Sequence, residues 1–134
     1  MQLTPDLQKQ LIETAIQVRQ WSYAPYSKYR VGASLLTASG KIYDGANIEN
    51  AVYPLGLCAE RVTLFKAVSE GERDFTAMVI ATENAGMPCG SCRQVMAEFG
   101  LTMRVIIVDA TGKIHHESTV ADLLPGAFTP KDLI

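Results

Sequence analysis

The three cysteines of the chain lie in two short segments that could together bind a metal ion. Cys58 is followed two positions later by a carboxylate, Glu60, and Cys89 and Cys92 form a Cys-x-x-Cys pair. Three thiolates can occupy three corners of a zinc tetrahedron and leave the fourth open, which distinguishes a catalytic zinc site from a structural one. Zinc in an open site lowers the pKa of its water towards neutrality, so the pattern indicates hydrolytic chemistry.

Glu60 is the candidate proton carrier, because it would lie beside the water without binding the metal. A first zinc ligand, a glutamate two residues later and a distant Pro-Cys-x-x-Cys are typical of zinc deaminases. We therefore interpret the two segments as a site for zinc-dependent hydrolytic deamination. Three thiolates on a divalent ion leave a net charge of about −1, which Arg61 could offset by donating to cysteine sulfurs.

Both cysteine segments are expected at helix N-termini, where the partial positive charge favours thiolate over thiol. The i, i+3 spacing of Cys89 and Cys92 places their sulfurs on one side of a helical turn. Hydrophobic periodicity and capping residues predict a helix from the Thr4 cap to near Tyr23 and a final one from the Thr119 cap through Leu124. Two further helices are predicted over 59–70 and 90–99, and an extended loop over 47–57.

Alternating or continuous apolar runs predict five strands, over 29–36, 41–44, 75–82, 103–108 and 113–117. The first two form a hairpin, and the alternation of strands and helices after it favours a largely parallel central sheet. The turn over 109–112 is too short for a parallel connection, so the last strand must be antiparallel to its neighbour. We expect an α/β fold in which a five-stranded mixed sheet lies between helices in three layers, as one domain over 1–134.

Composition narrows the possible functions. Apolar residues make up 48% and charged residues 19%, which is typical of a globular protein. No apolar run approaches the roughly 20 residues of a membrane span, and residues 1–10 do not resemble a secretory signal. An odd number of cysteines favours a reducing compartment, the cytoplasm. The net charge of −2 without a basic stretch argues against a nucleic-acid partner and favours a small neutral substrate.

Two plainer interpretations of the cysteines remain open at this point. Cys-x-x-Cys alone could be a redox pair, although this would leave Cys58 without a role. It could also be half of a structural zinc site, which would need a fourth ligand. His115 and His116 are the only histidines. They are neighbours on a predicted strand, so at most one could face inward, and we expect both to be solvated or hydrogen-bonded.

The chain resembles the small homotetrameric cytidine deaminases over nearly its whole length. The resemblance is carried by 24–27 (APYS), 31–33 (VGA), 47–51 (NIENA), 58–61 (CAER), 88–94 (PCGSCRQ) and 123–128 (LLPGAF). It implies one zinc ion per chain, held by Cys58, Cys89 and Cys92. Glu60 would be the general acid and base while water attacks the pyrimidine carbon that bears the amino group. Cytidine and deoxycytidine would become uridine and deoxyuridine with release of ammonia, a reaction of pyrimidine salvage.

The same resemblance implies how a nucleoside would be bound in a homotetramer with shared active sites. Asn47 and Glu49 would hydrogen-bond the ribose hydroxyls, and the backbone amide of Ala59 would contact the pyrimidine carbonyl. Three aromatic residues would border the substrate: Tyr29, where the family usually has Phe; Tyr53; and Phe128, which would stack on the base from a neighbouring subunit. The segment 83–87 is shorter than is usual in the family.

Three rival functions are compatible with parts of the pattern. A related aminohydrolase could act on a cytosine-like compound such as blasticidin S, although the segment 47–50 favours a ribose. A nucleic-acid editing deaminase would share the zinc motifs but carry a helix where only 109–112 stands. A structural zinc or redox-switch protein would show a closed four-ligand site, or a dithiol, and would not depend on Glu60.

Overall fold

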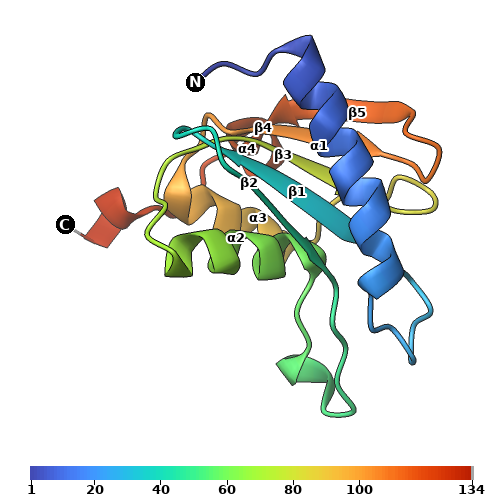
Figure 1. Cartoon of the computed structure of the whole chain (residues 1–134). Helices are drawn as coiled ribbons and strands as arrows, with labels where there is room; N and C mark the ends of the chain where they lie inside the picture. Colours follow the sequence, from blue (N-terminus) through green and yellow to red (C-terminus); the bar gives the residue numbers. More distant parts are fainter. Residues whose placement is uncertain (134) are drawn as a thin grey trace.

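The computed structural model describes residues 1–133 and contains a five-stranded sheet between helices (Figure 1). The strands are β1 Gly32–Thr37, β2 Ile42–Ala46, β3 Phe75–Ala81, β4 Arg104–Val108 and β5 Ile114–Thr119. The α-helices are α1 Pro5–Val18, α2 Ala59–Ser69, α3 Gly90–Phe99 and α4 Val120–Leu123. Short 3-10 helices cover Arg19–Trp21, Tyr53–Leu55 and Pro130–Leu133.

Local sequence signals account for most helix ends. The Thr4 side chain accepts a hydrogen bond from the backbone N–H of Leu7 and caps α1. Thr119 and Asp122 form a reciprocal capping box at α4. Gly71 has φ of 99° just after α2, a left-handed conformation in which glycine ends helices without strain. The first helix ends earlier than predicted, because a 3-10 turn replaces its last residues.

The strand order is β2-β1-β3-β4-β5, and only β3 and β4 pair in parallel. The prediction of a mixed five-stranded sheet with an antiparallel last strand is confirmed, but the prediction of a largely parallel centre is wrong. The connection through α2 starts from β2 and not from β1, because β2 first folds back on β1 as a hairpin. It therefore passes over β1 and inserts β3 antiparallel to it.

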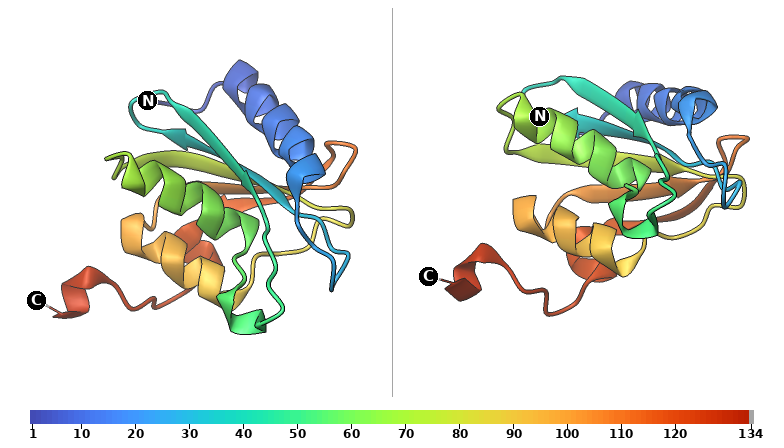
Figure 2. Two further views of the ribbon diagram at one scale, coloured as in Figure 1. Left: turned by 60° about the horizontal axis from the view of Figure 1, so that its bottom comes forward. Right: turned by 90° about the horizontal axis from the view of Figure 1, so that it is seen from below.

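The helices cover both faces of the sheet and make three layers (Figure 2). On one face, α1 buries Leu11 and Ala15 against a cluster that includes Val79 and Ile106. The other face carries α2, α3 and α4, whose apolar side chains form a second cluster with alternate strand residues such as Ile107. Among the described residues, no helix combines the length and the apolar character that crossing a bilayer requires.

The sheet brings the starts of two helices to the same end of its strands. Gly32 at the start of β1 pairs with Ala46 at the end of β2 and with Ala81 at the end of β3. Because β2 and β3 run in the same direction, the segments that follow them leave the sheet side by side. One leads into α2 and the other into α3, so both cysteine segments reach this end of the strands.

Candidate active site

The three cysteine sulfurs meet where α2 and α3 begin. Cys58 is the N-cap residue of α2, Cys89 is the N-cap residue of α3, and Cys92 lies within the first turn of α3. The Sγ atoms of Cys89 and Cys92 are 3.5 Å apart, those of Cys58 and Cys89 are 4.0 Å apart, and all three lie within 4.8 Å of one another. Sulfur ligands at the corners of a tetrahedron around one zinc ion lie at similar distances from one another. The prediction that the three sulfurs come together is confirmed.

The chemistry of this donor set fits zinc. Few common metals other than zinc prefer thiolate ligands. The Arg61 guanidinium supplies the neighbouring positive charge, since its Nη2 lies 3.5 Å from the Cys58 sulfur. Its Nε is buried and has no hydrogen-bond partner among the described residues. A buried guanidinium nitrogen without a protein partner is accounted for by negative charge on the nearby sulfurs.

The pKa values of two thiols move apart in the cluster. A hydrogen bond from Cys92 and the nearby guanidinium of Arg61 lower the pKa of Cys58 to about 5. The same hydrogen bond and burial raise the pKa of Cys92. In turn, the hydrogen bond to Cys58 raises the pKa of Arg61 and keeps it a cation. The shift favours the thiolate form of Cys58, which is the form that binds metal.

Glu60 follows Cys58 into the first turn of α2 and is nearly buried, with 5% of its surface exposed. Burial raises the pKa of its carboxyl group. Together with Cys58 and Cys89 it lines a cavity of about 240 Å³. A buried carboxyl group beside a cavity is placed to exchange a proton with a group bound there.

The loop between β2 and α2 brings Asn47 and Glu49 to the same cavity. Two backbone hydrogen bonds between Ile48 and Leu57, of 3.0 and 2.9 Å, close the loop at its base. Asn47 and Glu49 therefore line the same cavity as Cys58, although eight or more residues of loop intervene along the chain. The remainder of the loop extends beyond this end of the strands (Figure 1).

The Asn47 side chain is almost fully used within the protein. Its Oδ1 accepts from the Ser22 hydroxyl and from the N–H of Val31, and its Nδ2 donates to the Tyr29 carbonyl at 2.8 Å. An amide has two N–H groups, so one remains for a ligand. Asn47 thus combines a structural function with a second amide N–H, on a residue that lines the cavity.

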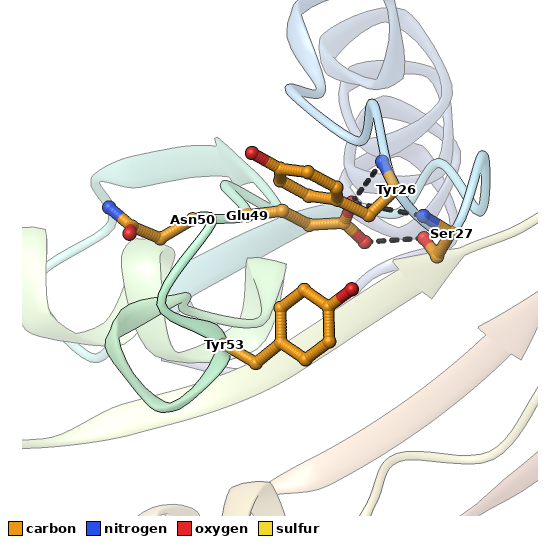
Figure 3. A pocket seen from close by; sticks show the side chains of 5 residues that line it. All are labelled: Tyr26, Ser27, Glu49, Asn50 and Tyr53. Atoms are coloured by element: carbon orange, nitrogen blue, oxygen red, sulfur yellow. Dashed lines mark hydrogen bonds between the residues drawn. The ribbon is translucent and has the colours of Figure 1, made fainter.

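Glu49 is also held by the chain. One carboxylate oxygen accepts from the backbone N–H groups of Tyr26 and Ser27 at 3.0 and 3.1 Å, and the other accepts from the Ser27 hydroxyl (Figure 3). The Ser27 hydroxyl is the largest cause that lowers the Glu49 pKa. Glu49 lines both the cysteine cavity and a second hollow, whose other residues are Tyr26, Ser27, Asn50 and Tyr53.

The remaining predicted residues are distributed between the cavity and other places. Tyr29 lines the cavity, and Ala59 is buried at the first position of α2, where backbone N–H groups have no helical partner. Tyr53 lies in the second hollow, with its ring edge against Tyr26. Phe128 is 56% exposed on the C-terminal segment and does not line the cavity of its own chain.

Sequence reasoning did not assign several residues that line the cavity. They are Ser27, Val31, Ile80, Thr82, Gly86 and Met87. The last three belong to the segment that joins β3 to Cys89, and such a segment must border a site at that cysteine. The two histidines are exposed and bind Asp109 and Ser118, as expected. Within residues 1–133, no cysteine or histidine joins the three sulfurs as a fourth ligand.

Comparisons with known proteins agree with this site. The family model described as the cytidine and deoxycytidylate deaminase zinc-binding region matches residues 5–109. A protein of Halalkalibacterium halodurans named cytidine deaminase is 51% identical over 126 residues, which are 92% of this chain and 95% of that protein. One from Sporosarcina psychrophila with the same name is 49% identical over 131 residues, 96% of this chain and 95% of that protein.

The fold agrees as well. The crystal structure of cytidine deaminase from Burkholderia pseudomallei superposes with a TM-score of 0.86 at 44% identity, and covers 94% of this chain and 100% of that one. Similarity of this extent in sequence and in backbone shows that the chain belongs to the cytidine deaminase family, whose zinc-binding region it contains.

Proposed function

We propose that this protein hydrolyses cytidine and deoxycytidine to uridine and deoxyuridine and releases ammonia. The observation that carries the proposal is the buried Glu60 carboxyl group in a cavity that is also lined by Cys58 and Cys89, two of the three clustered cysteines. The names of the relatives at about half identity support the same substrate class. The net charge of −2 without a basic stretch favours a small nucleoside over a nucleic-acid strand.

Cys58, Cys89 and Cys92 would hold one zinc ion per chain. When bound there, zinc supplies a Lewis acid that activates water as a nucleophile at neutral pH. Arg61 would offset the negative charge of the thiolates through its contact with the Cys58 sulfur. The absence of a fourth cysteine or histidine ligand among residues 1–133 supports a catalytic metal over a closed structural one.

Glu60 would carry the protons of the reaction. Its carboxylate takes a proton from the attacking water and gives it to the ring nitrogen next to the carbon under attack. Glu60 then takes the remaining proton from the hydroxyl group that has been added to this carbon and delivers it to the amino group. The hydroxyl becomes a carbonyl as the carbon–nitrogen bond breaks, and the amino group leaves as ammonia. Burial supports this cycle, because it raises the pKa of the Glu60 carboxyl group and so favours uptake of a proton.

The rest of the cavity would orient the nucleoside. The free N–H of Asn47 and the fixed carboxylate of Glu49 would bind the ribose hydroxyls. The backbone N–H of Ala59, at a helix start where it has no helical partner, would donate to the pyrimidine carbonyl. Tyr29 would border the base, and Tyr53 would close the outer end of the site from the second hollow.

The chain would work as a homotetramer in the cytoplasm, as one domain over 1–134. Large apolar side chains are exposed on the loop before α2, including Val52, Tyr53 and Leu55, and a subunit interface would cover them. Phe128 is exposed on the C-terminal segment, where its backbone carbonyl accepts a hydrogen bond from Gln94 of α3 at 2.8 Å, and its ring would reach the base bound by a neighbour. Three free cysteines suit a reducing compartment.

The test of the reaction is the loss of the cytidine absorbance band on mixing with metal-analysed protein, together with an assay for ammonia. We expect turnover of cytidine and deoxycytidine at about one zinc per chain. Glu60→Gln should keep zinc and lose about 10²- to 10⁴-fold or more in kcat. Turnover of blasticidin S alone would favour the related aminohydrolases, and an active Glu60→Gln protein would refute the proton-carrying role.

The test of shared active sites is complementation between two defective proteins. Glu60→Gln chains keep Phe128, and Phe128→Ala chains keep a complete zinc site. If the Phe128 ring acts across an interface, mixed assemblies contain some sites with both Glu60 and Phe128. Activity after mixing and re-association should then exceed the summed activities of the two separate variants. A fully active monomer in sedimentation experiments would contradict the tetramer.

A further inference from the structure

The segment between β3 and Cys89 forms one wall of the cavity. Thr82, Gly86 and Met87 of this segment line the cavity together with Tyr29, which is distant from them in the sequence. The segment carries the cavity wall and one cysteine of the cluster, so its conformation affects both. What holds the segment in place is therefore relevant to substrate binding.

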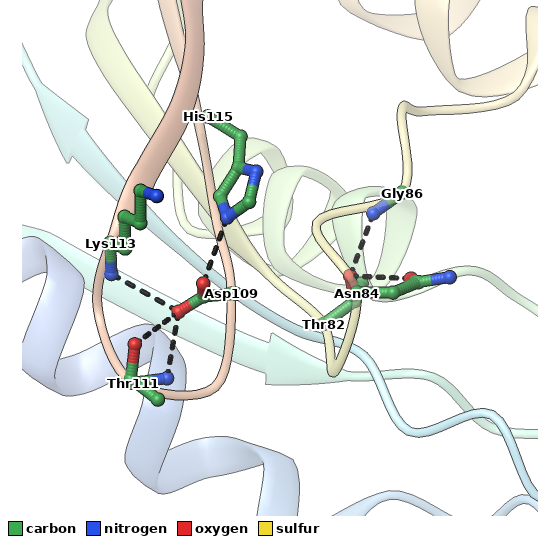
Figure 4. Close-up of polar contacts among 7 residues, drawn as sticks. All are labelled: Thr82, Asn84, Gly86, Asp109, Thr111, Lys113 and His115. Atoms are coloured by element: carbon green, nitrogen blue, oxygen red, sulfur yellow. Dashed lines mark hydrogen bonds and ion pairs between the residues drawn. The ribbon is translucent and has the colours of Figure 1, made fainter.

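Thr82 and Asn84 build the turn at the start of this segment. The Thr82 hydroxyl accepts from the backbone N–H of Gly86 at 2.9 Å and lies 3.4 Å from the Asn84 side-chain oxygen (Figure 4). Ala85 between them has φ of 57°, in the left-handed region that non-glycine residues rarely adopt. The turn is thus a defined conformation that needs specific contacts to persist.

Tyr29 is attached to this turn by its hydroxyl. The Tyr29 hydroxyl donates to the Asn84 Oδ1 at 2.8 Å, a contact between residues 55 positions apart. The position of Gly86 depends on the same hydroxyl, because a Cβ added there would lie 2.3 Å from it. The glycine and the hydroxyl therefore fit each other closely, and the Asn84 oxygen fixes the hydroxyl in that place.

Tyr29 also connects the turn to the opposite side of the cavity. Its backbone carbonyl accepts the hydrogen bond from Asn47 Nδ2 at 2.8 Å. A chain of contacts thus runs from Asn84 through Tyr29 to Asn47, and both Tyr29 and Asn47 line the cavity. None of these contacts involves Glu60 or a sulfur atom.

We propose that Asn84 is a positioning residue for the substrate: it anchors the Tyr29 hydroxyl against Gly86 and so sets the width of the cavity. The inference rests on the proposed nucleoside deaminase function. Because the network is separate from Glu60 and the cysteines, its loss should weaken substrate binding and leave the chemical step intact. The expected signature is a change in KM without a matching change in kcat.

The first experiment compares Asn84→Ala, Tyr29→Phe and the double variant in cytidine kinetics. Each single variant should raise KM about threefold to tenfold, which is the change in affinity expected from the loss of one hydrogen bond. The kcat should stay within about twofold of wild type. Zinc content should stay the same. The KM of the double variant should not exceed the higher KM of the two single variants, because both substitutions remove the same contact. Asn84→Asp keeps the acceptor oxygen and should restore KM, and exposed Glu83→Ala is the matched control.

The second experiment tests the fit between Gly86 and the hydroxyl directly. Gly86→Ala in the wild-type background should lower the unfolding temperature and raise KM, because the methyl group and the hydroxyl cannot occupy the same space. The same substitution in the Tyr29→Phe background should be tolerated, since the next ring atom is 3.5 Å away. This rescue is specific to the proposed contact.

Two results would overturn the inference while the proposed function stands. One is a wild-type KM in Asn84→Ala, and the other is an equal effect of Gly86→Ala in both backgrounds. A wild-type protein that deaminates no nucleoside would instead contradict the proposed function, and the positioning role of Asn84 would fail with it. The wild-type assay therefore separates the two failures before any variant is made.

Discussion

The carboxylate of Glu49 and the side chain and backbone of Ser27, 22 positions apart in the chain, are joined by two hydrogen bonds. A third bond comes from the N–H of Tyr26 at 3.0 Å. A carboxylate proposed to bind the substrate is therefore also the group that holds the turn around Ser27. Binding and local structure depend on the same charge, which is kept by a lowered pKa.

This relationship predicts graded effects of two substitutions on KM for cytidine. Glu49→Gln removes the charge that accepts three bonds, and should raise KM about tenfold or more. Ser27→Ala removes only the hydroxyl and leaves the carboxylate, so it should raise KM about threefold. Steady-state kinetics with zinc content measured in parallel would check this. Equal KM values in Glu49→Gln and wild type would contradict the assignment.

Arg61 is predicted to retain the metal. Its Nη2 contacts the Cys58 sulfur at 3.5 Å, and removal of this positive charge leaves the thiolates without compensation. Arg61→Ala should therefore weaken zinc binding about 10- to 100-fold, as is usual for groups that support metal ligands. Competition with a colorimetric chelator would measure the change. Arg30→Ala removes an exposed arginine and should behave as wild type.

Asp109 is predicted to make stability depend on pH. The Thr111 hydroxyl and then His115 hold the pKa of Asp109 well below its usual range. A lowered folded-state pKa stabilises the protein above the unfolded value, about pH 4, and the contribution is lost as the pH falls through the folded value. Asp109→Asn should lower the unfolding temperature at pH 7, and the difference from wild type should shrink below about pH 4. Exposed Asp74→Asn should show no such convergence.

Gly32 is predicted to be essential for the contact of α1 with the sheet. A Cβ at this position would lie 2.1 Å from the carbonyl oxygen of Ala15, a backbone atom that moves only if the helix moves. Gly32→Ala should destabilise the protein by about 1–3 kcal/mol, the usual cost of overpacking. Gly90 has no atom within 4 Å of its added Cβ, so Gly90→Ala is the matched control. Denaturant unfolding would measure both, and equal midpoints would contradict the argument.

Local sequence patterns predicted the elements that present the metal ligands. The helix over 90–99 has the predicted bounds. Cys89 and Cys92 fall at its start, and their i, i+3 spacing places them on one side of a turn. The donor set also follows from residue types alone, since the three thiols are the only cysteines of the chain. The capping box of Thr119 and Asp122 is a similarly local signal.

The sheet order was less accessible, because strand pairing is not a local property. The hairpin was predicted, yet the pattern of residues 75–82 does not tell whether that strand lies beside β1 or β2. The structure places it beside β1, so that Val79 pairs with Ser34 in antiparallel register. Pairing between strands so far apart in the chain depends on tertiary packing and not on the local residue pattern.

The sequence by itself determined the kind of chemistry: three thiol ligands, a carboxylate two residues after the first, and helix starts that favour thiolates. Tertiary structure alone decided which distant groups meet. It joins Ser27 to Glu49, brings Cys58 within 4.0 Å of Cys89, and sets the Tyr29 hydroxyl on Asn84. The physical reason is that ligand type and helix geometry depend on neighbours along the chain, whereas these contacts depend on how the whole chain packs.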